Sequence, residues 1–134
     1  VPGHVLFTID LRHPDRTTLI GLGDQVGAVC RAHAGPCAVS ITEVSLTLPV
    51  QFEGPVPAAV RSASERLGLS AMPILSGAGH DAENLHRVCP TGMLFVPCER
   101  GISHNEAENA RPEDLAAGAR VLAEVLVDLA EGDQ

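Results

Sequence analysis

The chain has 134 residues, 45% of them apolar and 19% charged, which suits one folded domain or two small pieces and excludes a disordered chain. Seventeen acidic side chains outweigh nine basic ones, all Arg, and the formal net charge of -8 argues against a nucleic-acid partner. No apolar run reaches the roughly 18 residues of a membrane span and no export signal opens the sequence, so we expect a cytoplasmic protein with no membrane partner.

The first 50 residues contain two segments in which apolar and other side chains alternate. The alternation over 5–11 predicts one strand, and the alternation over 37–48 predicts a second. Between them the sequence predicts a helix. Pro14-Asp15 is typical of a helix start, and apolar residues recur at helical spacing until Gly35-Pro36. The predicted unit is β-α-β, with a crossover long enough for parallel strands. Because the first strand has almost no residues before it, we expect a fragment or a processed product.

A linker follows at 49–57, where three Pro and one Gly exclude a helix or a central strand. Beyond it the pattern predicts a short helix at 58–67 that is capped by Gly68, and a last amphipathic helix from Pro112 to Gly132. Between these two helices we expect a strand at 69–75, a helix at 81–88 and a strand at 92–96.

Four cysteines lie inside apolar stretches, with no C-x-x-C pair among them. This arrangement favours small buried apolar side chains in a reducing compartment over disulfide bonds or a zinc knot. We therefore expect buried thiols at Cys30, Cys37, Cys89 and Cys98.

Two predicted loops combine glycine with histidine at the ends of strands, where open α/β sheets tend to bind ligands. In Ser76-Gly-Ala-Gly-His-Asp81, the two glycines permit positive φ and close approach of backbone N–H groups to an anion, and Asp81 is a candidate helix cap. A plain tight turn explains the same residues. In Gly101-Ile-Ser-His104, the histidine is a candidate ligand or an ordinary surface side chain. Arg12, at the end of the first strand, offers a planar fork to a carboxylate or forms a surface ion pair.

Together, in this order and at this spacing, these segments resemble the zinc-type amidohydrolases that act on N-carbamoyl amino acids, allantoate and β-ureidopropionate. The resemblance extends nearly from end to end of the chain. It is carried by Val1-Pro-Gly, Thr8-Ile-Asp-Leu-Arg-His-Pro14, Ser76-Gly-Ala-Gly-His-Asp-Ala82, Val88-Cys-Pro-Thr91, Phe95-Val-Pro97, Gly101-Ile-Ser-His-Asn105 and Pro112-Glu-Asp-Leu-Ala-Ala-Gly118.

The resemblance implies an α/β fold in two parts. Residues 1–50 would be the β-α-β second half of a ferredoxin-like lid and dimerisation domain, and 51–134 the C-terminal α/β segment of a dinuclear metallopeptidase-like catalytic domain. The implied protein is a homodimeric hydrolase that cleaves the carbamoyl or linear amide C–N bond of N-carbamoyl-amino acids, allantoate or similar ureido acids.

The same resemblance assigns roles to five residues. His104 matches the last metal-ligating histidine, and His80 a catalytic histidine that contacts the scissile carbamoyl or amide group. Arg12 matches the lid arginine that binds the substrate carboxylate, and the backbone at Gly77 and Gly79 lines the same pocket.

The implied cofactor is a pair of divalent metal ions, zinc or manganese, with cobalt and nickel also compatible with His and carboxylate donors. The other metal ligands of the family would lie upstream of Val1, so we expect the isolated chain to be inactive and metal-free. Two non-enzymatic alternatives stay open, a truncated relic without catalysis and a small module for dimerisation or anion binding.

Overall fold

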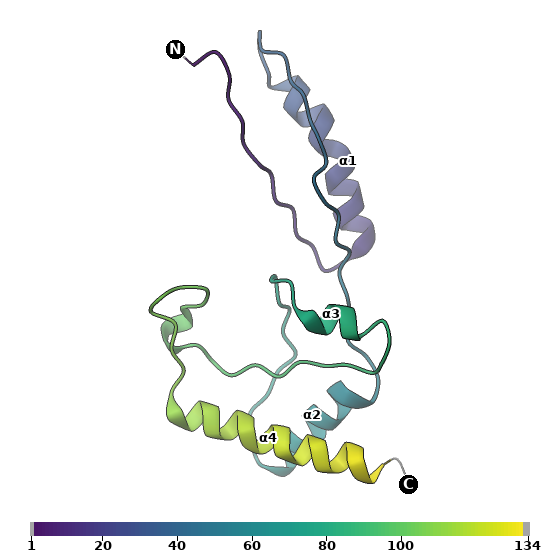
Figure 1. Cartoon of the computed structure of the whole chain (residues 1–134), viewed down its shortest axis with the longest axis vertical. Helices are drawn as coiled ribbons and strands as arrows, with labels where there is room; N and C mark the ends of the chain where they lie inside the picture. The colour runs from purple at the N-terminus through teal and green to yellow at the C-terminus, as the bar shows by residue number, and fades with distance from the viewer. Residues whose placement is uncertain (1, 133–134) are drawn as a thin grey trace. The chain divides into compact units, whose positions relative to one another are not determined.

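The structure is a computed structural model that describes residues 2–132 (Figure 1). The chain divides into two compact units, Val1–Val50 and Gln51–Gln134. Each unit is described by itself.

One long helix, α1 (Arg16–Ala32), organises the first unit. The Asp15 carboxylate caps it by accepting hydrogen bonds from the Thr18 N–H at 2.8 Å and the Thr18 hydroxyl at 2.7 Å. These two bonds lower the pKa of Asp15, because they stabilise its charged form. Arg31 in the last turn complements the helix dipole, and the chain turns away at Gly35 with φ of 58°. The predicted helix and its start at Pro14-Asp15 are confirmed.

As described from residue 51 to residue 132, the second unit contains three α-helices and a short 3-10 helix. They are α2 (Pro55–Arg66), α3 (Asp81–Leu85), η1 (Glu99–Gly101) and α4 (Pro112–Glu131). The start of α2 lies inside the predicted 49–57 linker, because a proline is tolerated in the first helical turn. Gly68 follows the end of α2 with φ of 65°, as its predicted role at the helix end requires. The prediction that Asp81 caps α3 is wrong, since the N-cap residue is His80.

Helices α2 and α4 pack on each other and form the core of the second unit. Ala63 is 0% exposed, and its small side chain lets the valines of α4 approach, with Val121 at 3% and Val125 at 4%. Around them pack Ala59, Val60, Leu67, Leu69 and Leu129.

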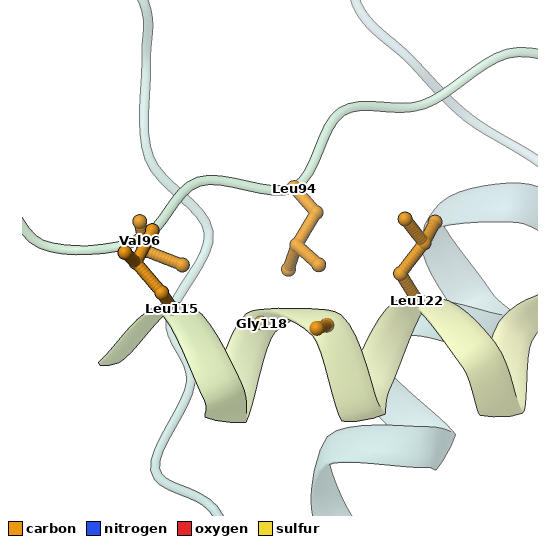
Figure 2. A pocket seen from close by; sticks show the side chains of 6 residues that line it. Leu94, Val96, Leu115, Gly118 and Leu122 are labelled. Atoms are coloured by element: carbon orange, nitrogen blue, oxygen red, sulfur yellow. The ribbon is translucent and has the colours of Figure 1, made fainter. Parts of the chain in front are cut away.

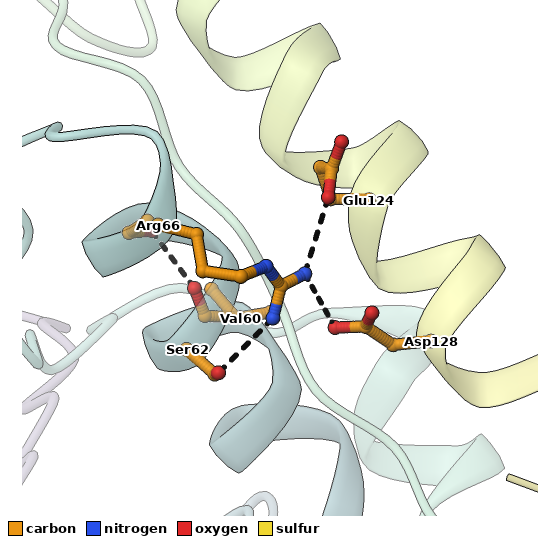
Figure 3. A network of polar contacts seen from close by, with 6 residues as sticks. Val60, Ser62, Arg66, Glu124 and Asp128 are labelled. Atoms are coloured by element: carbon orange, nitrogen blue, oxygen red, sulfur yellow. Dashed lines mark hydrogen bonds and ion pairs between the residues drawn. The ribbon is translucent and has the colours of Figure 1, made fainter.

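A charged side chain ties the two helices together at the rim of this core (Figure 3). Arg66 of α2 donates from Nη2 to Asp128 at 2.8 Å and to Glu124 at 3.2 Å, both on α4. Ser62 accepts from Nη1 of the same guanidinium at 3.1 Å. The hydrogen bonds to Asp128 and then Glu124 raise the pKa of Arg66, so the charge of this rim contact persists over the whole physiological pH range.

The predicted strands are not assigned anywhere in residues 2–132, which contain helices and irregular segments. Segments 5–11, 37–48, 69–75 and 92–96 lie outside the helices, and Figure 1 draws them as tubes without strand arrows. Val5 is 71% and Phe7 69% exposed, so the face that the alternation marks for burial is open. A strand requires a ladder of hydrogen bonds to a neighbour, and alternation does not say which chain segment provides it. The β-α-β prediction is therefore not confirmed.

Two smaller expectations concern thiols and membrane spans. All four cysteines are free, but Cys37 and Cys89 are exposed, so the prediction of burial is wrong for these two. Cys37 begins segment 37–48, and Cys89 lies between α3 and segment 92–96. Within residues 2–132, no helix combines the length and the apolarity that a membrane-spanning helix needs.

Candidate functional site

The turn between Ser76 and His80 is held by hydrogen bonds of its own side chains. The Ser76 Oγ lies 2.7 Å from the His80 Nε2, and both side chains are half-buried. The Ala78 N–H donates to the same Oγ at 3.3 Å, and the His80 N–H donates to Glu83 Oε1 at 3.2 Å. Neither Gly77 nor Gly79 adopts a positive φ, so the expectation that this turn uses the left-handed region is not met. A Cβ at Gly79 would meet no atom within 4 Å, which leaves that backbone open to a ligand.

Phe95 connects this turn to segment 92–96. Its ring meets the His80 ring edge-on, with centroids 5.5 Å apart and planes at 63°. Segment 92–96 is in turn seated on both long helices of the unit. A Cβ at Gly92 would lie 2.9 Å from a Val56 methyl of α2, and a Cβ at Gly118 of α4 would lie 2.5 Å from a Val96 methyl. The packing of α2 and α4 thus determines where Phe95 stands against His80.

A shallow apolar groove borders this contact on α4 (Figure 2). Its volume is about 370 Å³, and it is lined by Leu94, Val96, Leu115, Gly118, Ala119 and Leu122. No polar side chain lines the groove, so it has no side-chain hydrogen-bonding group that could recognise a polar substrate. We therefore place the candidate site at His80 and not in this groove.

His104 lies in a loop whose backbone takes an uncommon conformation. Three residues of this short stretch have positive φ: Arg100 at 57°, Gly101 at 70° and His104 at 54°. Only a few per cent of non-glycine residues adopt positive φ values. Such a conformation is strained and is kept only where neighbouring contacts hold the backbone, which is often the case at functional sites. The Ile102 N–H bonds to the Glu99 carbonyl, which closes the turn before His104.

Two acidic side chains supply those surroundings. The His104 N–H donates to Glu108 Oε2 at 2.6 Å. At the base of the loop, the Asn109 side-chain amide donates to Glu99 Oε2 at 2.9 Å, and the Glu99 N–H donates to the Asn109 carbonyl at 2.6 Å. Glu108 therefore fixes the backbone of His104.

The donor set for a metal ion is incomplete in the described chain. The His104 side chain is exposed, and an imidazole nitrogen is a suitable ligand for zinc, manganese, cobalt or nickel. Among residues 2–132, no three His, Cys, Asp or Glu side chains come together in a metal-binding group. His104 thus fits a metal site as one donor that needs others, and the described residues alone do not form the site.

Arg12 belongs to the first unit and pairs with Asp10. Its Nη2 donates to Asp10 Oδ2 at 2.6 Å and its Nε to both carboxylate oxygens at 3.1 Å. This hydrogen bonding lowers the pKa of Asp10 and raises that of Arg12. Both side chains are well exposed, 63% for Arg12 and 64% for Asp10. The pair lies at the edge of segment 5–11.

The structure joins some of the expected site residues and reveals others. It brings His80 together with Ser76 and Phe95, while no described hydrogen bond or ion pair connects His80 with His104. The role of Ser76 was missed, although its spacing of four residues from His80 across a Gly-x-Gly turn is a readable signal. His86 was also missed: its ring lies edge-on to Phe52 at 5.4 Å, and its Nδ1 is buried without a hydrogen-bond partner in the described residues.

Residues 5–128 match Peptidase family M20/M25/M40, and the chain therefore belongs to this family. More particularly, it is 42% identical over 135 residues to an N-carbamoyl-L-amino-acid amidohydrolase of Rhizobium meliloti, which covers 98% of this chain and 32% of that protein. It is 38% identical over 133 residues to an allantoate amidohydrolase of Escherichia coli (strain K12), which covers 97% of this chain and 32% of that protein. These matches confirm the resemblance that the sequence motifs predicted.

Solved structures agree with this assignment. The chain is similar to an amidase of the hydantoinase/carbamoylase family from Burkholderia multivorans, with a TM-score of 0.81 and 40% identity over 87% of this chain and 29% of that one. A family amidase from Burkholderia vietnamiensis gives a TM-score of 0.76 and 39% identity. The fold is thus that of this amidase family, and the chain spans about a third of the length of these relatives.

Proposed function

We propose that the chain is the C-terminal part of a metal-dependent hydrolase that cleaves the carbamoyl or linear amide C–N bond of N-carbamoyl-amino acids, allantoate or similar ureido acids. The observation that carries the proposal is the family match over residues 5–128, together with two relatives named for these activities that cover 97–98% of the chain. We call the longer polypeptide the intact protein, and place it in the cytoplasm.

Residues 1–50 would form the β-α-β half of a ferredoxin-like lid through which two copies dimerise, with α1 as the crossover helix. The proposal is supported by exposed apolar side chains in the segments that precede and follow α1 in the sequence, such as Phe7 at 69% and Ile41 at 44% exposure. Strands that expose such rows pair readily with other strands. The rest of the intact protein and the second copy would supply these partners.

His104 would be one ligand of a pair of divalent metal ions, zinc or manganese, with cobalt and nickel as alternatives. Its positive φ and the Glu108 contact to its N–H support this role, because they fix the backbone from which the imidazole extends. The bound metals would supply an activated water and polarise the scissile carbonyl. The other donors would come from the remainder of the intact protein.

The remaining residues would bind and orient the substrate. Arg12, which pairs with Asp10, would take the carboxylate that all these substrates carry, by paired hydrogen bonds. His80 would contact the scissile carbamoyl or amide group, and the backbone of Gly77 and Gly79 would line the same pocket. Binding energy at the remote carboxylate would thus be used to align the reacting bond.

The test is turnover by the intact protein, prepared metal-free and loaded in turn with zinc, manganese, cobalt and nickel. N-carbamoyl-amino acids and allantoate form the substrate panel, and the corresponding esters, which lack the free carboxylate, serve as controls. We expect metal-dependent cleavage of at least one ureido acid and little cleavage of its ester. No turnover of any panel member with any of the four metals would overturn the proposal and favour a non-catalytic module.

A further inference from the structure

The hydroxyl of Ser76 and the ring of His80 make the closest side-chain contact in the turn 76–80. The Oγ to Nε2 distance is 2.7 Å, and both groups are half-buried. A serine hydroxyl has one hydrogen to donate and two lone pairs that accept. Because the Ala78 N–H already donates to this Oγ, the turn fixes the position of the hydroxyl as well.

The other contacts of His80 place it at the start of α3 and beside Phe95. Glu83 accepts from the backbone N–H, which anchors the start of α3. Phe95 covers one part of the ring at a centroid distance of 5.5 Å, a contact that does not distinguish the two nitrogens. Ser76 alone provides a direction for Nε2.

We propose that Ser76 is a positioning residue, which holds the His80 ring through Nε2 in the orientation in which the ring contacts the scissile carbamoyl or amide group of the substrate. The inference rests on the proposed function for the identity of that group. The 2.7 Å contact fixes the direction of Nε2, so the serine sets the orientation of the ring. The substrate carboxylate is bound elsewhere, so Ser76 acts on the reaction step more than on binding.

A purely structural serine predicts something different. If Ser76 only stabilised the turn, its removal would loosen residues 76–80 as a whole and disturb activity through the backbone. The loss would then persist in a protein that lacks the His80 ring. Double-mutant cycles separate the two cases, because residues that act through each other are not additive.

The experiment uses the intact protein with Ser76→Ala, Ser76→Thr, His80→Ala and the double variant Ser76→Ala/His80→Ala. Ser70→Ala is the matched control, since Ser70 is an exposed serine outside the turn. We expect Ser76→Ala to lower kcat roughly 10- to 100-fold with KM changed less than about threefold, and Ser76→Thr to recover most of kcat. In the His80→Ala background, Ser76→Ala should cause no further loss. A further loss equal to that in the wild-type background, or no rescue by threonine, would overturn the proposal.

A second measurement does not depend on turnover. In a crystal structure of intact Ser76→Ala, we expect the His80 ring to be rotated or to occupy two orientations, while the backbone of 76–80 stays in place. A single unchanged ring orientation would overturn the inference even in an active protein. A wild-type protein without turnover would instead overturn the proposed function, and the ring orientation would still decide the role of Ser76.

Discussion

Gly118 in α4 offers a direct test of how segment 92–96 is seated. A Cβ at this position would stand 2.5 Å from the Val96 Cγ1, a separation that real side chains do not reach, so Val96 would have to move by roughly an ångström. Overpacking of this kind costs about 1–3 kcal/mol, and replacing glycine by alanine inside a helix returns about 1 kcal/mol. We therefore expect Gly118→Ala to destabilise α4 locally by about 1 kcal/mol.

Gly23 in α1 is the matched control, because a Cβ there would meet no atom within 4 Å. Gly23→Ala should stabilise its own helix by about 1 kcal/mol, since only the helix propensity changes. Amide hydrogen exchange of the intact protein, followed by mass spectrometry, reports the two helices separately. Exchange should become roughly fivefold faster in α4 for the first variant and roughly fivefold slower in α1 for the second. If Gly118→Ala instead slowed exchange in α4, the contact between Val96 and α4 would be refuted.

Two further predictions concern charged groups in the first unit. Arg12→Ala should raise KM for acidic substrates roughly 100-fold with a small change in kcat, and Arg12→Lys should recover little, because an ammonium group lacks the planar fork; equal kinetics of Arg12→Lys and wild type would contradict the bidentate contact. The second prediction concerns Asp15, whose pKa is lowered from 3.8 by the hydroxyl and N–H of Thr18. A carboxylate whose pKa is lower in the folded than in the unfolded protein stabilises the fold fully when the pH is above its unfolded-state pKa. This stabilisation is lost as the pH falls through its folded-state pKa. Exchange in the first turn of α1, corrected for intrinsic rates, should therefore accelerate below about pH 4, and Asp15→Asn, which caps without titrating, should remove that pH dependence.

The helices were the most predictable part of the fold, because their signals are local. Asp15 as a cap and Pro112 in a first turn determine helix starts through a few neighbouring atoms, and both predictions are confirmed. The start of α2 at Pro55 was missed, because a proline-rich run reads as a linker unless one of its prolines is recognised at a first turn. Strands depend on distant partners, and the alternation in segment 5–11 marks one face for burial without saying which segment covers it.

The candidate site was predictable from motifs and not from single residues. His104 alone is an ordinary loop histidine. The resemblance to the amidohydrolases depended on finding it together with the motifs in segments 8–14 and 76–82. The supporting contacts were not predictable, since the Glu108 bond to the His104 N–H and the Phe95 contact with His80 depend on how loops close in space. The roles of Arg12, His80 and His104 stay predictions.

The central claim is that His104 is a metal ligand of a hydrolase, and metal content measured together with turnover tests it most directly. The intact protein, its His104→Ala variant and a His33→Ala control, in which an exposed histidine outside the site is removed, would be purified with the same metal supply. We expect His104→Ala to lose at least one metal ion per subunit and all detectable turnover, and His33→Ala to keep both. A His104→Ala protein that kept the full metal content and the turnover of the wild type would contradict the account.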